Sequence, residues 1–516
     1  MYDIIIIGGG ISGLYLAYKL QKKFKILLLE KSNYLGGRIY THNCNVDSMK
    51  CRYEVGAGRL SSNHKLLIDL IDDLGLKNKL VQIPTKKKHI HNYNTNYSQF
   101  YKISKDEKLD ISFLLQIVFK KTKNYSDKYL KNVLFIELID NILSKDAAQF
   151  LLDSYGYTAE FLVLNAYDAI RLFKNDFNLK NKFYILDGGL SQVLNCIKNR
   201  LHNVTIIKRT LVEDYRYKNN IFRVKTKNLF NNVDYTAKKV IFATHKNGLS
   251  NIPSLINNSR ISKLINSVEE IPMARIYAVF KPKKKSKVWF HNIGKITTNG
   301  PIQYIIPINK QKGIIMISYP DLDRAIYWKD KNMEGQLNKK IMYEIRKMFP
   351  KLTIPNPDYL KMHFWNNGVH YYKPSMSSAS VASKIIKPFK SKELYITGEA
   401  YSCRQAWIEG ALETSETVIK KILSNRPKTG GLNIDFENLP LITLKEVSRH
   451  NTLNSAWTVI DGLVLDITDW IKLHPGGDII KKSMGRDTTK EWWEIPAHSV
   501  SIVNNIFPKY VIGKLK

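Results

Sequence analysis

Three glycines near the N-terminus have the spacing of a dinucleotide-binding turn. Gly8, Gly10 and Gly13 directly follow the apolar run of residues 3–7 and precede a helical pattern. In that context they allow a tight turn, a close approach of the backbone to a pyrophosphate, and close packing of the helix on the strand. The start of the helix then offers unpaired N–H groups to the phosphates. We therefore predict that these glycines and Ser12 contact a dinucleotide.

A carboxylate stands where the ribose of such a dinucleotide needs an acceptor. Glu30 closes a second apolar run, residues 25–29, and follows Gly10 by 20 residues. At the end of the second strand of a dinucleotide-binding fold, an acidic side chain accepts hydrogen bonds from the ribose hydroxyls. Glu30 is therefore predicted to bind the cofactor.

Two histidines near the C-terminus have the arrangement of haem ligands. His474 and His498 lie 24 residues apart, and Pro475-Gly476-Gly477 after the first can end a helix and present its imidazole to a pocket. Neutral imidazoles from opposing sides can hold haem iron from both faces. Trp470, one helical turn before His474, can pack against a macrocycle. We predict that His474 and His498 bind a b-type haem.

Four further motifs resemble the flavin-containing amine oxidase superfamily and occur in its order over about residues 1–422. They are Leu35-Gly36-Gly37-Arg38, Asp187-Gly188-Gly189-Leu190, Tyr395-Ile396-Thr397-Gly398-Glu399 and Trp407-Ile408-Glu409-Gly410-Ala411. The resemblance implies FAD, with Arg38 near the pyrophosphate and Glu399 near the ribityl chain or phosphates. It also implies cofactor contacts from Gly37, Gly398, Trp407 and Ile408. The covalent flavin cysteine of monoamine oxidases has no counterpart between Trp365 and Pro374, so FAD should be non-covalent.

Within this superfamily, the segment from Tyr53 to Ser61 with His64 is most similar to L-amino-acid oxidases. The similarity implies that Arg59 holds a substrate carboxylate, a task that suits a bidentate guanidinium. The alternative is an arginine that pairs with a structural carboxylate or with the cofactor phosphates, so Arg59 also counts as a cofactor contact.

Aromatic residues fall where the same family builds the walls of its substrate site. The resemblance places Trp407 against the substrate and Trp365 near the flavin. Tyr371 or Tyr372 could add a second wall or a hydroxyl. Aromatic walls favour a neutral amine and exclude water. The family usually has a lysine, bridged to the flavin by water, where this chain has Arg275. Arginine does not lose its proton, so this departure argues against a rapid reaction with oxygen.

The C-terminal region, residues 441–516, resembles cytochrome b5. Val459-Ile460-Asp461-Gly462 and Tyr510-Val511-Ile512-Gly513 match its strands, in addition to the two histidines. A haem-free, steroid-binding relative is the alternative, but such relatives usually lose the histidines. No apolar tail follows Lys516, so we expect no membrane-anchored form.

These motifs must be positioned by alternating strands and helices, with apolar strands also at residues 240–243 and 394–397. The expected fold is an α/β, Rossmann-like FAD-binding domain with an inserted α+β substrate domain, followed by a small α+β cytochrome b5-like domain. The FAD-binding part would comprise about residues 1–80, 184–268 and 375–422, and the substrate part about 81–183 and 269–374. Residues 423–440, rich in Pro, Gly and Asn, would be a linker.

The composition of the 516 residues, 44% hydrophobic and 24% charged, excludes global disorder. The net charge is +35, but only 16 of the 80 basic residues are Arg. Because nucleic-acid readers rely on Arg, this composition argues against a nucleic-acid partner, and we expect the run Lys86-Lys87-Lys88 to be solvated.

The chain has neither a membrane-length apolar run nor a basic leader before its first strand. Its four cysteines form no CxxC pair and no dense disulfide pattern. We therefore expect a soluble intracellular, cytoplasmic protein in a reducing compartment.

Together these features favour an enzyme that oxidises the C–N bond of an amine or L-amino acid with FAD. Electrons would then pass to the fused haem or to oxygen. One alternative is a C–C desaturase or a protoporphyrinogen-type oxidase, which would not need Arg59. An alternative of another class is a basic binding protein on a retired flavin fold.

Overall fold

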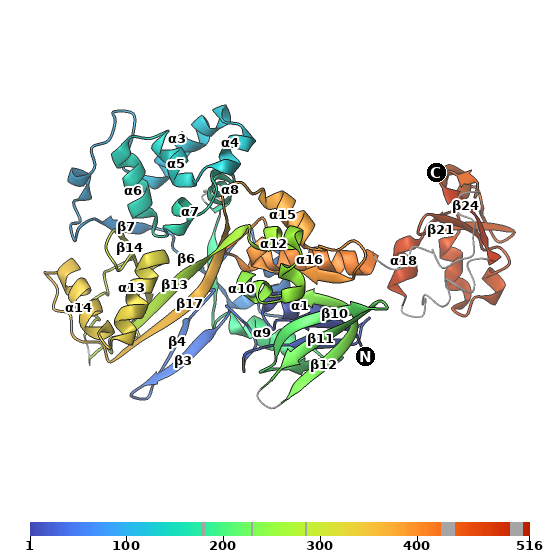
Figure 1. Ribbon diagram of the computed structural model, residues 1–516, viewed down its shortest axis with the longest axis horizontal. Coiled ribbons are helices and arrows are strands. Elements are labelled where there is room, and N and C mark those ends of the chain that lie inside the picture. Colours follow the sequence, from blue (N-terminus) through green and yellow to red (C-terminus); the bar gives the residue numbers. More distant parts are fainter. Residues whose placement is uncertain (177–180, 229–230, 284–285, 425–438, 496–508) are drawn as a thin grey trace. The chain divides into compact units, whose positions relative to one another are not determined.

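The computed structural model describes residues 1–176, 181–228, 231–283, 286–424, 439–495 and 509–516. It separates into two compact units, Met1–Ile419 and Lys420–Lys516 (Figure 1). Each unit is described by itself below. Among the described residues, no helix has both the length and the apolar character needed to cross a bilayer.

A seven-stranded sheet forms one side of the first unit. Its order is β10-β11-β12-β1-β2-β9, with β18 also paired to β12. The parallel strands are β1 (Tyr2–Ile7), β2 (Ile26–Leu29), β9 (Val204–Ile207), the end of β12 (Asn232–Phe242) and β18 (Leu394–Ile396). β10 (Leu211–Lys218) and β11 (Ile221–Lys227) form an antiparallel extension. The strands predicted near residues 3–7, 25–29, 240–243 and 394–397 are thus confirmed.

Buried parallel strands explain the unbroken apolar runs in the sequence. Ile4, Ile5 and Ile6 of β1 are fully buried, as are Ile26 and Leu27 of β2. A strand covered on both faces needs apolar residues at every position rather than at alternate ones. Helices that pack near this sheet are α1 (Ile11–Leu20), α9 (Ser191–Asn199), α10 (Lys246–Ser250), α11 (Pro253–Ile256), α12 (Ser259–Ile265) and α16 (Ile408–Ser424).

A six-stranded sheet forms the other side of the first unit, in the order β17-β13-β16-β15-β14-β7. Its strands are β17 (Tyr359–Tyr372), β13 (Val268–Val279), β16 (Ile314–Ser318), β15 (Tyr304–Asn309), β14 (Lys295–Thr298) and β7 (Lys87–Ile90). The long pair β13–β17 runs through the middle of the unit in Figure 1. On this side lie α13 (Leu322–Met333) and α14 (Leu337–Met348), whose Trp328 and Ile341 are fully buried.

A cluster of helices occupies the region between residues 100 and 176, which contained no recognisable motif. It consists of α3 (Ile111–Lys121), α4 (Asp127–Asn132), α5 (Phe135–Asp140), α6 (Lys145–Tyr155), α7 (Ala159–Leu162) and α8 (Ala166–Asp176). The unit also contains β5 (Leu60–Ser61), β6 (Leu80–Ile83), β8 (Phe183–Leu186), α2 (Lys65–Asp73) and α15 (Ser378–Ile385).

The hairpin of β3 (Thr41–Val46) and β4 (Met49–Glu54) holds a disulfide that the sequence analysis did not anticipate. Cys44 and Cys51 face each other in the register, with their Cα atoms 5.1 Å apart, and they form a disulfide. Their spacing matches no cysteine motif, because the pairing depends on the register of the hairpin rather than on a fixed interval.

The second unit is a small sheet with short helices. Its strands are β19 (Leu441–Ile442), β20 (Asn451–Thr452), β21 (Ser455–Ile460), β22 (Leu463–Asp466), β23 (Arg486–Asp487) and β24 (Val511–Leu515). α17 (Leu444–Val447), α18 (Thr489–Glu494) and two 3-10 turns, Ile471–Leu473 and Gly477–Ser483, complete it. The core contains Ala456, Leu463 and Leu465.

Candidate active site

A cavity of about 1720 Å³ lies in the first unit and is lined from both sheets. Ordinary small-molecule sites measure roughly 300–1,000 Å³, so this one can take a dinucleotide together with a second small molecule. Its lining includes residues that follow four neighbouring parallel strands: Gly8 after β1, Glu30 after β2, Thr244 after β12 and Gly398 after β18. The carboxyl ends of parallel strands share one edge of the sheet, which is where such folds bind nucleotides.

The glycine turn leaves room for a ligand on one side and packs tightly on the other. A Cβ at Gly13 would lie 2.0 Å from the carbonyl oxygen of Gly8, and Gly8 itself has φ +109°. A Cβ at Gly10, by contrast, would meet no atom within 4 Å, and Gly10 lines the cavity. Gly13 therefore serves the contact of helix and strand, whereas Gly10 leaves open space beside the N-terminus of α1, where a phosphate would fit.

Glu30 is held at the edge of the sheet by two backbone donors. Its carboxylate oxygens accept hydrogen bonds from the N–H groups of Gly9 and Ser32, each at 2.7 Å. The carboxylate thus lies between the glycine turn and the loop after β2, and it faces the cavity. Its remaining lone pairs are available to ribose hydroxyls.

A row of acidic and basic side chains connected by close contacts begins at the cavity. Arg38 donates to Glu399 at 2.7 Å, and the Nδ1 of His370 lies 2.9 Å from the same carboxylate. The Nε2 of His370 lies 3.3 Å from Glu270, which also contacts His245 at 3.0 Å. Burial alone would raise the pKa of Glu399, but the charge of Arg38 and the His370 ring hold that pKa well below its usual range. Glu399 is therefore a fixed anion that orients Arg38.

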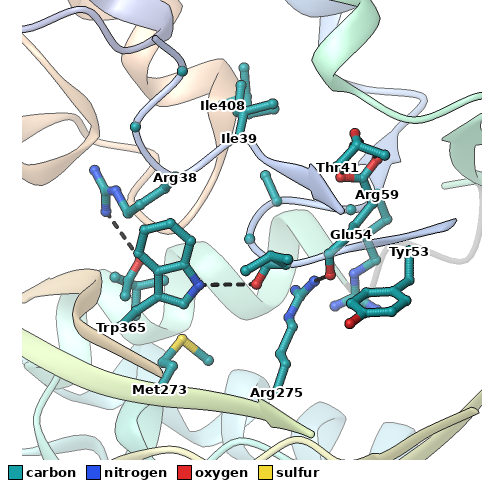
Figure 2. Close-up of a pocket in the computed structure, with 18 of the residues that line it drawn as sticks. Arg38, Ile39, Thr41, Tyr53, Glu54, Arg59, Met273, Arg275, Trp365 and Ile408 are labelled. Atoms are coloured by element: carbon teal, nitrogen blue, oxygen red, sulfur yellow. Dashed lines mark hydrogen bonds between the residues drawn. The ribbon is translucent and has the colours of Figure 1, made fainter. Parts of the chain in front are cut away.

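Trp365 and Arg275 hold the loop that presents Arg59, as Figure 2 shows. The indole N–H of Trp365 donates to the carbonyl oxygen of Val55 at 3.0 Å. The guanidinium of Arg275 donates to the carbonyl oxygen of Glu54 at 2.9 Å and to the hydroxyl of Tyr319 at 3.0 Å. Both residues also line the cavity.

Arg59 projects into the cavity among aromatic rings. Its guanidinium carbon lies 5.3 Å from the ring centre of Phe183, 5.6 Å from that of Trp407 and 6.0 Å from that of Tyr157. Trp407 also contacts His64, with ring centres 4.7 Å apart. Arg59 and Trp407, which were each predicted to contact the substrate, thus lie close together. The surrounding aromatic faces stabilise the planar cation of Arg59.

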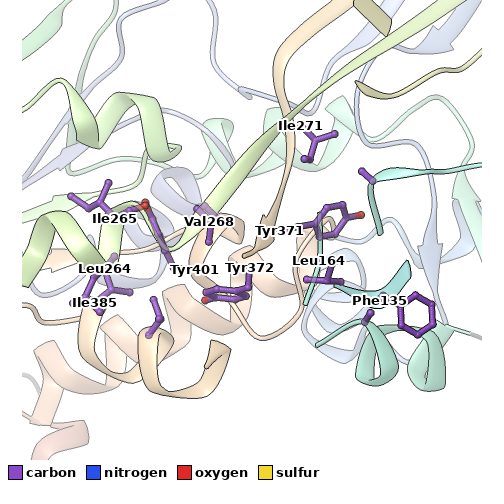
Figure 3. Packing of buried hydrophobic residues seen from close by; sticks show 14 of the residues in the cluster. Phe135, Leu164, Leu264, Ile265, Val268, Ile271, Tyr371, Tyr372, Ile385 and Tyr401 are labelled. Atoms are coloured by element: carbon purple, nitrogen blue, oxygen red, sulfur yellow. The ribbon is translucent and has the colours of Figure 1, made fainter. Parts of the chain in front are cut away.

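Tyr371, and not Tyr372, reaches the cavity from the end of β17. Tyr371 lines the cavity and donates its hydroxyl to Glu160 at 2.9 Å. Tyr372 is 1% exposed and is absent from the lining of the main cavity. It points into the apolar core with Leu164 and Tyr401 (Figure 3). Neighbouring residues of a strand point to opposite faces, so the choice between the two tyrosines depended on the strand's orientation.

Lys87 departs from the expectation that the run Lys86-Lys87-Lys88 is solvated. Lys86 and Lys88 are exposed, but Lys87 is partly buried and donates from Nζ to the carbonyl oxygen of Tyr155. Strand β7 begins at Lys87, and the alternation of a strand turns this side chain inward.

The family of the first unit follows from a family model. Residues 11–422 match the model of the flavin containing amine oxidoreductases. The chain belongs to this family. Residues 443–516 match the cytochrome b5-like haem/steroid-binding domain. The chain is therefore a flavin-dependent oxidoreductase joined to a cytochrome b5-like domain, with FAD and haem as cofactors.

Similarities to individual proteins are partial. The chain is 52% identical over 58 residues to acyl-lipid (8-3)-desaturase B of Dictyostelium discoideum, which covers 11% of this chain and 12% of the desaturase. It is 38% identical over 76 residues to cytochrome b5 isoform D of Arabidopsis thaliana, covering 14% of this chain and 53% of the cytochrome. The chain thus covers less than two thirds of either relative.

A solved structure shares the fold of the flavin unit. It comes from Exiguobacterium sp. 255-15 and is provisionally described as a protoporphyrinogen oxidase. The TM-score is 0.60 at 15% sequence identity, over 81% of this chain and 98% of that one.

The cavity of this flavin oxidoreductase suits FAD in two observable respects. The open positions beside Gly10 and Gly37 line the cavity, and no side chain fills the space where their Cβ atoms would project. The hydroxyl of Thr244 is buried at the same edge without a hydrogen-bond partner among the described residues. A buried hydroxyl normally has a partner, so it is available to a bound group. Ser12, Arg38, Gly398, Glu399 and Ile408 line the same cavity and would hold FAD with them.

The haem site is described in part. His474 follows the turn Ile471–Leu473, and a Cβ at Gly476 would lie 2.8 Å from its Cε1, so glycine gives the ring its room. Leu473 and Ile479 beside it are 64% and 53% exposed, an apolar surface that a flat macrocycle would cover. His498, the second predicted ligand, lies outside the described residues.

Several residues that line the cavity or contact Arg59 escaped the sequence analysis. Thr244 had a usable signal, since it follows directly on the predicted strand at residues 240–243. Tyr157, Phe183 and Lys87 had none, because three separate segments of the chain bring them to Arg59.

Proposed function

We propose that this flavin oxidoreductase oxidises the C–N bond of an amine or, preferentially, an L-amino acid. The observation that carries the proposal is the guanidinium of Arg59 inside the cavity, framed by Tyr157, Phe183 and Trp407. A guanidinium binds a carboxylate by two parallel hydrogen bonds. When bound, FAD supplies the acceptor for the hydride equivalent that such an oxidation removes.

The side chains of the cavity would orient the substrate rather than move its protons. Arg59 would bind the carboxylate, and the aromatic faces of Trp365 and Trp407 would exclude water and favour the neutral amine. Arg275 keeps its proton under all ordinary conditions, so it cannot serve as a base. Its hydrogen bonds to Glu54 and Tyr319 suit a positioning residue that holds the loop of Arg59.

We further propose that the haem receives the electrons in preference to oxygen. Fusion of the two cofactor domains in one chain raises their effective concentration for each other. Arg275 stands where the family usually has a lysine that assists the reaction with oxygen. Because arginine does not lose its proton, this difference also favours the haem as the electron acceptor.

The test is an anaerobic spectrum of the purified holoenzyme with a panel of L-amino acids and amines. We expect the flavin band to bleach with an amino acid, followed by the bands of reduced b-type haem. Arg59→Ala should raise KM for the amino acid about 100-fold, as expected for the loss of a charge-assisted contact of about 3 kcal/mol. KM for the amine that lacks the carboxylate should change little. Bleaching by no amine or amino acid would overturn the proposal.

A second candidate is the oxidation of C–C or ring bonds, as in protoporphyrinogen-type oxidation. It is favoured by the size of the cavity, about 1720 Å³, which also suits a bulkier substrate. Under this reading no amino acid would reduce the flavin.

A further inference from the structure

Two lysines face the cavity from neighbouring strands of the second sheet. Lys87 of β7 and Lys295 of β14 are Cα partners in a parallel pair, and both line the cavity. Partner residues on adjacent strands point to the same side of a sheet. The two ammonium groups therefore lie on one wall.

The protein provides these lysines with neutral partners. The Nζ of Lys87 donates to the carbonyl oxygen of Tyr155, and the Nζ of Lys295 donates to that of Pro84 at 2.6 Å. Lys87 also lies 5.0 Å from the ring centre of Tyr155. Within the described ranges, neither lysine forms an ion pair with a carboxylate within 4 Å, unlike many surface lysines of this chain.

The charges that surround Lys87 are mostly of its own sign. Burial, the nearby charge of Arg59 and, to a smaller extent, that of Lys295 together lower the pKa of Lys87 to about 7, although Glu160 opposes the shift. Burial and Arg59 likewise lower the pKa of Lys295 to about 8. The charges that act on Lys87 are thus two cations, Arg59 and Lys295, and one carboxylate, Glu160. An anion bound among them would relieve their repulsion and replace their lost hydration.

We propose that Lys87 and Lys295 form a second anion-binding subsite, so that the substrate has a carboxylate or phosphate in addition to the carboxylate bound by Arg59. The inference rests on the proposed function for its assignment of Arg59. It narrows the substrate class to amino acids, or related amines, with an anionic side chain.

Binding to the oxidised holoenzyme tests the proposal without turnover. Titration calorimetry would compare glutarate with pentanoate, which has the same chain length but one carboxylate. We expect glutarate to bind at least about tenfold more tightly, the effect of one hydrogen bond to a charged group. Lys87→Met and Lys295→Met should each reduce this preference and leave the affinity for pentanoate unchanged. Lys283→Met, an exposed lysine outside the cavity lining, is the matched control for net charge.

The pH dependence gives a second measurement. The affinity for glutarate should fall as the pH rises above about 7, because Lys87 then loses its proton. The affinity for pentanoate should stay nearly level over the same range. If Lys87→Met loses its FAD or its fold, Lys87→Arg, which keeps its charge at all ordinary pH values, should restore the preference. The loss of affinity for glutarate should then begin only above about pH 8, where Lys295 loses its proton.

The outcomes separate this inference from the proposed function. Equal binding of glutarate and pentanoate, or a preference that Lys87→Met and Lys295→Met leave intact, would overturn the subsite even if amino acids reduce the flavin. A lysine-dependent preference without any amino-acid oxidation would support the subsite and refute only the proposed function.

Inorganic phosphate that competes with glutarate in the wild type, but not in Lys87→Met, would support a phosphate as the second group. Lysine-dependent glutarate binding without such competition would support a carboxylate.

Discussion

At the cofactor end of the cavity, a few polar and charged side chains hold one another in position. Glu399 is central, since it accepts from Arg38 at 2.7 Å and contacts the ring of His370 at 2.9 Å. It also accepts from the N–H of Ala406 at 2.8 Å, directly before Trp407. One carboxylate therefore links the Arg38 loop, strand β17 and the start of the last helix of the flavin unit.

Replacing this carboxylate should affect the cofactor more than the rest of the fold. Glu399→Gln leaves Arg38 and His370 beside a neutral amide, which we expect to cost about 1–3 kcal/mol of unfolding free energy. The protein should emerge from gel filtration with clearly less FAD per chain, measured from the ratio of flavin to protein absorbance. Glu393→Gln serves as the control, because it removes the charge of a partly exposed carboxylate that pairs with Lys239 and Lys387. Equal FAD content in both variants would contradict the role of Glu399.

At the scale of elements, the turn between β1 and α1 must satisfy two demands at once. One glycine lets the helix approach the strand, and another leaves space for a phosphate. The distances separate these tasks, since a Cβ at Gly13 would meet the backbone of Gly8, whereas a Cβ at Gly10 would meet no protein atom.

Alanine at these two glycines should therefore give opposite results. Gly10→Ala should leave the free energy of unfolding of the FAD-free protein within about 0.5 kcal/mol of the wild type but weaken FAD binding at least tenfold. Gly13→Ala should destabilise the FAD-free protein itself, because a backbone clash has to be relieved. Urea denaturation and flavin-fluorescence titration measure the two effects. FAD binding by Gly10→Ala as tight as by Gly300→Ala, a glycine outside the cavity lining, would argue against a phosphate at this turn.

At the scale of the whole molecule, two cofactor units share one chain. Each has its own buried core, with Ile4 and Leu27 in the flavin unit and Leu463 and Leu465 in the cytochrome b5-like unit. Separate cores imply that the loss of one cofactor need not unfold the other unit.

Replacement of His474, the predicted haem ligand that lies within the described residues, tests this independence. His474→Ala should lose nearly all of the b-type haem absorbance, because one of the two predicted axial ligands is missing. Substrate should still bleach the flavin under anaerobic conditions, with no haem bands to follow. Lys472→Ala, an exposed neighbour, should keep both signals. Loss of flavin bleaching in His474→Ala alone would show that the units depend on each other.

The sequence by itself determined the features that rest on local geometry. A glycine turn after an apolar strand, a carboxylate that closes the next strand, and Gly398-Glu399 after β18 each need only a few consecutive residues, and the sheet order brings them to one edge. The buried strands could be located for a similar reason, because parallel strands covered on both faces need unbroken apolar runs.

Only the tertiary structure decided which side chains share the substrate end. Tyr371 rather than Tyr372 enters the cavity because of the orientation of β17, and Lys87 turns inward because β7 begins there. The Cys44–Cys51 disulfide follows from the register of a hairpin. Arg59 meets Tyr157, Phe183 and Trp407 from distant segments. Such contacts depend on strand register and on packing between remote segments, and neither leaves a periodic signal in the sequence.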